Sequence, residues 1–71
     1  MKILVIGSGG REHAIIWKLR QSKPLPKIYC APGNGGISRD AEIVDLQSDD
    51  IKGLLDFAVK EKIDLTITGP E

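Results

Sequence analysis

A short apolar run that ends in closely spaced glycines sets the strongest limit on the fold of this chain. Residues 3–6 are all aliphatic, and Gly7, Gly9 and Gly10 follow with only Ser8 between them. An apolar run without polar alternation is typical of a strand that is buried on both faces of a parallel sheet. An amphipathic helical pattern begins directly after the glycines. The backbone N–H groups of such a turn and the positive end of the helix dipole favour a bound anion at one place.

Apolar periodicity and turn residues predict the other elements. We expect a helix over about 11–21, ended by a proline-containing stretch, and strands over 27–31, 41–45 and 64–68. The strand at 41–45 carries charged residues beside its apolar pair, which indicates a place toward the edge of the sheet. A second helix begins at Ser48 or Asp49. Its apolar face has the spacing of a helix and consists of Ile51, Leu54, Leu55, Ala58 and Val59.

This order of elements, β-α-β-β-α-β, predicts an α/β fold with a Rossmann-like, doubly wound parallel sheet. Right-handed crossovers favour the strand order 3-2-1-4. The first and fourth strands are then neighbours where the winding reverses, and ligands bind in the crevice at the carboxyl ends of such strands. We therefore expect the glycine turn at 7–10, the loop at 32–36 and the stretch at 69–71 to converge on one rim.

Length and composition exclude several classes of protein. The chain has 71 residues, which is one small domain at most, and its ten basic residues balance ten acidic ones, so bulk charge does not favour a nucleic acid as partner. Cys30 and His13 are the only cysteine and histidine, so the chain forms neither a disulfide nor a zinc site, and we expect Cys30 to pack as a small apolar residue. No run is long enough for a signal peptide or a membrane span, and we expect a cytoplasmic protein.

The glycine turn only partly fits the known nucleotide-binding patterns. Gly7 and Gly9 match a dinucleotide fingerprint, but Glu12 stands at the third glycine position, and residues 30–32 lack the acidic residue that binds a ribose. NAD binding is therefore disfavoured. No Gly-Lys-Ser/Thr follows the turn, which excludes a P-loop. Three glycines are more than a tight connection needs, and they favour a bound phosphate over a purely structural turn.

A polar cluster opens the first helix. Glu12 is either a partner of the helix dipole or a functional residue, and His13 is either a satisfied polar residue under the loop or a functional one. Arg11 opposes the dipole, so a bound anion or a neighbouring acid is expected beside it. Trp17 is interpreted as a core residue.

Three motifs, taken together, resemble the amino-terminal domain of the phosphoribosylamine–glycine ligases, also called glycinamide ribonucleotide synthetases. They are Gly-Ser-Gly-Gly-Arg-Glu-His at 7–13, Ala-Pro-Gly-Asn at 31–34 and Thr-Gly-Pro-Glu at 68–71, in the order and at the spacing of that family. The resemblance implies that residues 1–71 are a single, partial substrate-binding domain of an ATP-grasp enzyme. That enzyme, of purine biosynthesis, converts ATP, glycine and 5-phosphoribosylamine to glycinamide ribonucleotide, ADP and phosphate.

The resemblance also implies a phosphoribosyl-substrate site, in which Glu71 holds ribose hydroxyls. The residues of this site come from three loops and are Gly7, Ser8, Gly9, Gly10, Arg11, Glu12, Gly33, Asn34, Gly69, Pro70 and Glu71. It implies no catalytic residue and no metal ligand within the chain, because ATP and Mg²⁺ or Mn²⁺ would bind in ATP-grasp domains outside it. The chain alone is therefore expected to have no ligase activity, and the complete enzyme to be monomeric.

The end of the chain, directly after a strand and without a closing helix, predicts that it is a fragment of something longer. We expect such a piece to be marginally stable or to self-associate. Two other functions stay open at this point. One is an NAD(P)-binding Rossmann module of an oxidoreductase, and the other is a truncated, non-catalytic scaffold that binds nothing.

Overall fold

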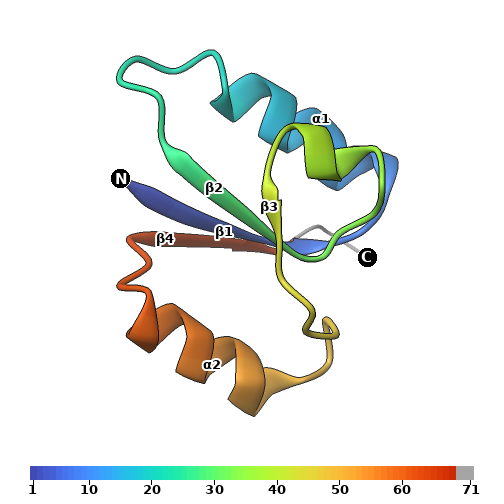
Figure 1. Ribbon diagram of the computed structural model, residues 1–71, viewed down its shortest axis with the longest axis vertical. Helices are drawn as coiled ribbons and strands as arrows, with labels where there is room; N and C mark the ends of the chain where they lie inside the picture. The colour runs from blue at the N-terminus through green and yellow to red at the C-terminus, as the bar shows by residue number, and fades with distance from the viewer. Residues whose placement is uncertain (69–71) are drawn as a thin grey trace.

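The computed structural model describes residues 1–68 and consists of a parallel sheet with helices on both faces (Figure 1). The strands are β1 (Lys2–Gly7), β2 (Lys27–Pro32), β3 (Glu42–Ile43) and β4 (Leu65–Thr68). The helices are α1 (Gly10–Leu19) and α2 (Ile51–Lys60), with a short 3₁₀ helix, η1 (Ile37–Arg39), after β2. Figure 1 shows α1 on one side of the sheet and α2 on the other, so each helix covers one face.

The sheet has the order β3-β2-β1-β4, and all of its pairs are parallel. This confirms the predicted Rossmann-like α/β fold and the strand order 3-2-1-4. β1 lies inside the sheet because its middle residues are aliphatic and can be buried on both faces. Gly7 of β1 lies opposite Pro32 of β2, and Ile6 lies opposite Thr68 of β4. The carboxyl ends of three strands therefore meet at one edge.

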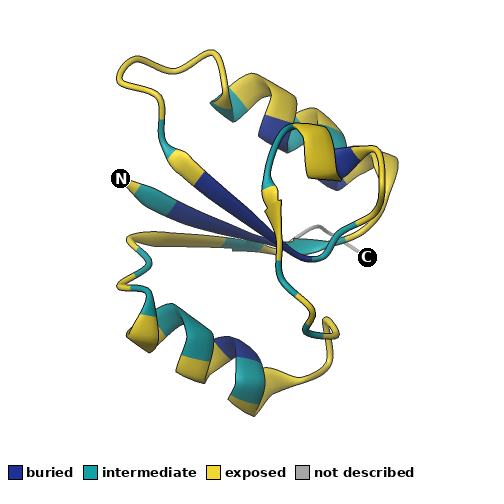
Figure 2. Ribbon diagram, in the orientation of Figure 1, coloured by how far each residue is buried: buried dark blue, intermediate teal, exposed yellow. Residues whose placement is uncertain are grey.

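The two faces of β1 bury side chains in different cores. Val5 packs in the core on the α1 side with Ile16, whereas Leu4 packs in the core on the α2 side with Leu54. Each fully buried aliphatic side chain stabilises the fold by roughly 1.5–3 kcal/mol. Figure 2 shows the result, with the middle of β1 and of β2 buried. Cys30 of β2 is 0% exposed in the α1-side core, which confirms that it packs as a small apolar residue.

The first helix is shorter than predicted, and Trp17 within it is exposed rather than buried. It ends at Leu19 rather than near residue 21. The backbone N–H groups of Gln21 and Ser22 donate to carbonyls three residues back, on Lys18 and Leu19, and so form a turn in place of the helix. The prediction that Trp17 lies in the core is wrong, because its side chain is 61% exposed. Ile16 takes the buried position of this turn, and successive residues of a helix point about 100° apart.

The second helix begins at Ile51 and is capped by Asp50, not by Ser48 or Asp49 as predicted. The Asp50 carboxylate accepts a hydrogen bond from the backbone N–H of Gly53, at 3.0 Å. Such a cap satisfies one of the N–H groups that have no partner within the helix. The apolar face is only partly covered, because among its predicted members only Leu54 is buried.

The third strand is also shorter than predicted, with two residues in place of the expected 41–45. The backbone N–H of Val44 still donates to the carbonyl of Cys30, at 2.9 Å. The N–H of Leu46 then donates to the carbonyl of Val44, two residues back, and this tight turn ends the pairing. β3 lies at the outer edge of the sheet, as its flanking charges predicted.

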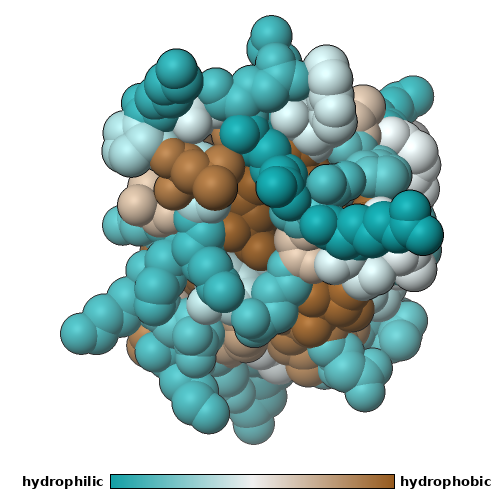
Figure 3. Space-filling model, turned by 45° about the horizontal axis from the view of Figure 1, so that its top comes forward, coloured by the Kyte–Doolittle hydropathy of each residue, from teal (hydrophilic) through white to brown (hydrophobic). Residues whose placement is uncertain are grey.

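Hydrophobic side chains remain at the surface near the other edge of the sheet. Ile51, Leu55 and Val59 are 71%, 62% and 71% exposed and form one stripe along α2, which we call the α2 stripe. A groove of about 220 Å³ lies between α2 and the β1–β4 strands, and its lining is Leu4, Ile6, Ile51, Leu54, Leu55, Ala58 and Thr66. On the face drawn in Figure 3, hydrophobic patches likewise interrupt the polar surface.

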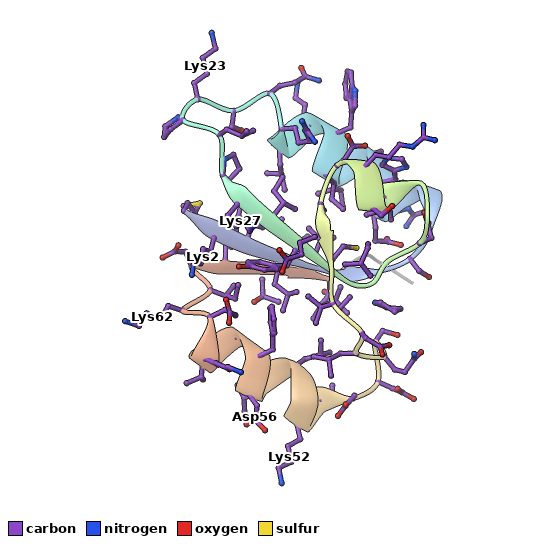
Figure 4. All side chains as sticks on the ribbon, viewed as in Figure 1. Lys2, Lys23, Lys27, Lys52, Asp56 and Lys62 are labelled. Atoms are coloured by element: carbon purple, nitrogen blue, oxygen red, sulfur yellow. The ribbon has the colours of Figure 1, made fainter. Side chains whose placement is uncertain are left out.

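Most of the labelled charged side chains point away from the sheet into solvent (Figure 4). Lys2 is an exception, because its ammonium group donates to the carbonyl of Glu61, at 2.9 Å, and its backbone N–H donates to the Asp64 carboxylate, at 2.7 Å. These bonds hold the start of β4 beside β1. Lys2 and Lys27 begin their strands, so they lie at the edge of the sheet opposite to the glycine turn.

Candidate functional site

Two glycine-containing loops lie side by side at the carboxyl edge of the sheet. The first follows β1, and the second follows β2. They are joined where the backbone N–H of Gly33 donates to the carbonyl of Gly7, at 3.1 Å. The Cys30 thiol also donates to that carbonyl, at 3.3 Å. The parallel pairing of β1 and β2 therefore continues into the loops, in agreement with the predicted convergence of the turn at 7–10 and the loop at 32–36.

Two of the glycines are required by their own surroundings. Gly7 has φ +142°, and a Cβ atom there would lie 2.5 Å from the Cγ atom of Glu12. Gly33 has φ +67°, and a Cβ atom there would lie 2.5 Å from the Cδ1 atom of Ile43. The positive φ at both positions strains any other residue, and at Gly7 the contact with the Glu12 side chain adds to that strain.

Gly10 differs, because a Cβ atom placed on it would meet no other described atom within 4 Å. It is the first residue of α1, and it borders a shallow hollow of about 280 Å³ with His13, Ala14 and Trp17. Ser8, Gly9 and Arg11 beside it are exposed as well. The N-terminus of α1, where backbone N–H groups lack partners within the helix, is thus open to solvent on this side.

Glu12 is buried beneath the glycine turn. Its Oε1 atom accepts a hydrogen bond from the backbone N–H of Gly9, the residue before the helix, at 2.8 Å. This is the first-turn role that the sequence offered for Glu12, in a favourable position for the helix dipole. The side chain folds back into the space that Gly7 leaves free.

The buried carboxylate also bears on what the turn can bind. A dinucleotide needs its pyrophosphate close to the N-terminus of the helix. Here the Gly9 N–H already has an anionic partner in Glu12. A second anion at the same N–H would meet like charge, which supports the view that NAD is a poor ligand.

Asn34 connects the two loops through its side-chain amide. Its Oδ1 atom accepts a hydrogen bond from the backbone N–H of Ile37, at 3.0 Å, and its Nδ2 atom donates to the carbonyl of Ser8. The backbone carbonyl of Asn34 accepts from the N–H of Ser38, at 3.1 Å. The start of η1 and the glycine turn are thus held by one residue.

His13 has a structural partner that the sequence did not indicate. Its Nε2 atom lies 2.8 Å from the Oδ2 atom of Asp40, and Arg20 lies 3.3 Å from the Oδ1 atom of the same carboxylate. This cluster ties α1 to the end of η1. It agrees with the reading of His13 as a satisfied polar residue. No motif pointed to Asp40, because 27 residues separate it from His13.

The Cys30 thiol does not supply a nucleophile at neutral pH. Burial, followed by the nearby charge of Glu12, raises its pKa to about 11. Only the thiolate is strongly nucleophilic. Cys30 therefore supports the loops by packing and by its hydrogen bond to Gly7.

Gly69, Pro70 and Glu71, the third part of the predicted site, lie outside the described residues. Over residues 1–68, no three or more His, Cys, Asp or Glu side chains are grouped to hold a metal ion. No Gly-Lys-Ser/Thr follows the glycine turn, so the turn is not a P-loop. Neither described helix is long and apolar enough to cross a membrane.

Comparison with known proteins identifies relatives over the whole chain. The family model described as phosphoribosylglycinamide synthetase, N domain, matches residues 1–71. Proteins named phosphoribosylamine–glycine ligase are 58% identical in Caldanaerobacter subterraneus subsp. tengcongensis, 52% in Clostridium acetobutylicum and 53% in Escherichia coli K12. Each match covers 100% of this chain but only 17% of the relative. The chain therefore belongs to the phosphoribosylglycinamide synthetase N-domain family.

Proposed function

We propose that this chain is the part of a phosphoribosylamine–glycine ligase that holds the phosphoribosyl end of 5-phosphoribosylamine. Its relatives carry that name, and each is much longer than the matched region. The complete enzyme would convert ATP, glycine and 5-phosphoribosylamine to glycinamide ribonucleotide, ADP and phosphate. ATP and Mg²⁺ or Mn²⁺ would bind in ATP-grasp domains outside residues 1–71. The chain alone would then release no ADP from ATP, glycine and the amine.

One observation carries the proposal: the N-terminus of α1 is open at Gly10 while the turn before it is held in place. The first N–H groups of a helix and its dipole together attract a phosphate. Arg11, exposed at the second position of α1, adds positive charge there. The Gly9 N–H already donates to Glu12, so it is not open to a ligand. The turn therefore suits a phosphate monoester beside Gly10 rather than a diphosphate that spans the whole turn.

The remaining contacts are expected from the family resemblance. Ser8, Gly33, Asn34, Gly69 and Pro70 would belong to the phosphoribosyl site, and the Glu71 carboxylate would hold the ribose hydroxyls. We expect the complete enzyme to act as a monomer in the cytoplasm on small-molecule substrates.

Titration of the ¹⁵N-labelled chain with ribose 5-phosphate tests this proposal. We expect the amide signals of residues 8–11 and 33–34 to shift, whereas ribose without phosphate and NAD leave them unchanged. Gly10→Val should abolish these shifts, because its side chain would fill the open approach. Gly35→Val is the matched control and should bind normally, because Gly35 is not among the expected site residues and a Cβ atom on it would meet nothing within 4 Å. A response to NAD, or none to ribose 5-phosphate, would contradict the proposal.

A further inference from the structure

The peptide unit that joins Ser8 to Gly9 is held at both of its ends. Its carbonyl oxygen, on Ser8, accepts a hydrogen bond from the Asn34 side-chain amide. Its N–H group, on Gly9, donates to the Oε1 atom of Glu12, at 2.8 Å. A peptide unit is planar and nearly rigid, so two bonds at opposite ends limit how far the whole unit can turn. One partner comes from α1 and the other from the loop after β2.

The orientation of the Asn34 amide follows from its neighbours. The Ile37 N–H can only donate, so the Asn34 atom 3.0 Å from it is the oxygen. The NH₂ group then faces the Ser8 carbonyl, which can only accept. Aspartate would keep the bond to Ile37 but would set a carboxylate oxygen against the Ser8 oxygen. The position therefore needs both a donor and an acceptor.

We infer that Asn34 is a positioning residue for the substrate phosphate, and not a residue that contacts the substrate. Together with Glu12 it holds the Ser8–Gly9 peptide. It thereby sets the direction in which the N–H groups of the first residues of α1 point. Both polar ends of the Asn34 side chain are engaged within the protein. These two bonds orient the amide toward backbone partners, and only its second N–H and second lone pair are left to meet a ligand. This inference rests on the proposed function, since it concerns the same phosphate.

Asn34→Asp separates a positioning role from the alternatives. In the complete ligase, we expect the KM for 5-phosphoribosylamine to rise about tenfold, the scale of one well-placed hydrogen bond, while kcat stays unchanged. In the 71-residue chain without ligand, the Gly9 amide should exchange its hydrogen about tenfold faster, although Asn34 does not bond to it. Ser38→Ala is the matched control, because it removes a hydrogen bond of 2.6 Å to Gly35 in the same loop and leaves the peptide held.

Two results would overturn the inference. A raised KM with unchanged exchange at Gly9 would mean that Asn34 contacts the substrate directly. A lowered melting temperature with unchanged KM would mean that Asn34 serves the fold alone. If Asn34→Asp does not fold, Asn34→Ala, which introduces no charge, is measured in the same way. If the wild-type chain does not bind ribose 5-phosphate, the proposed function fails. The hydrogen exchange rate of the Gly9 amide still reports whether Asn34 holds the peptide.

Discussion

Glu12 stands where dinucleotide-binding turns carry a third glycine, and it fills that space with a carboxylate. Its position in the first turn of α1 could be predicted from the sequence. The way its side chain folds back beneath Gly7 could not be predicted, because that depends on the positive φ of Gly7 and on the register of β1. The Asp40 partner of His13 was missed for a similar reason: only the folded chain brings α1 and η1 together.

Cys30 allows a prediction about the pH dependence of stability. Its pKa is 9.0 in ordinary surroundings and about 11 in the fold, where burial disfavours the thiolate. Between these values the unfolded chain has lost the thiol proton and the folded chain has kept it. The free energy of unfolding should therefore fall as the pH rises from 9 to 11, by up to about 1.4 kcal/mol per pH unit.

Urea denaturation at several pH values measures this effect. Burial, followed by the charges of Glu61 and Glu42, also raises the pKa of Tyr29, so the wild type contains more than one contribution at high pH. Cys30→Ala isolates the thiol, because it removes that group and leaves Tyr29 in place. Parallel pH profiles for the wild type and Cys30→Ala would contradict the prediction.

At the scale of elements, the buried strands were the easiest to predict and the ends of the helices the hardest. β1 and β2 are continuous apolar runs, and the structure places them within one residue or so of the expected bounds. The cap of α2 was assigned one or two residues early, since Ser48, Asp49 and Asp50 are all capable of capping. Only the backbone path decides which carboxylate reaches the Gly53 N–H.

The cap of α2 should contribute measurably to stability. Asp50→Ala removes the acceptor of the Gly53 N–H and should lower the free energy of unfolding by about 1 kcal/mol. Asp49→Ala, next to it in the chain, keeps the cap and should change stability by less than about 0.5 kcal/mol. Chemical denaturation of both variants decides the matter, and equal losses would show that Asp50 has no special role.

For the whole molecule, the handedness of crossovers was enough to predict the strand order. It could not say which apolar residues would stay uncovered. The α2 stripe has the same spacing as a core face, and the sequence grouped it with Leu54 and Ala58 in one apolar face. In the structure it flanks the apolar groove beside β4, an edge strand. Exposed apolar surface next to an unpaired strand edge favours association.

We therefore predict that the 71-residue chain self-associates through this surface. Its sedimentation coefficient should rise with concentration, and Leu55→Lys should abolish that rise, because a charge in the α2 stripe opposes burial against a second copy. Leu55 is 62% exposed, so the variant should still fold. Asp56→Lys is the matched control, because it adds a lysine to the outward side of the same helix (Figure 4). A compact monomer at all concentrations would contradict the prediction.

The doubly held Ser8–Gly9 peptide has a kinetic consequence. A loop that is already ordered loses little conformational entropy when a ligand arrives, and no slow closing step has to precede capture. Association should then proceed in a single phase at a rate limited by diffusion and orientation, and differences in affinity among ligands should arise from how fast they leave.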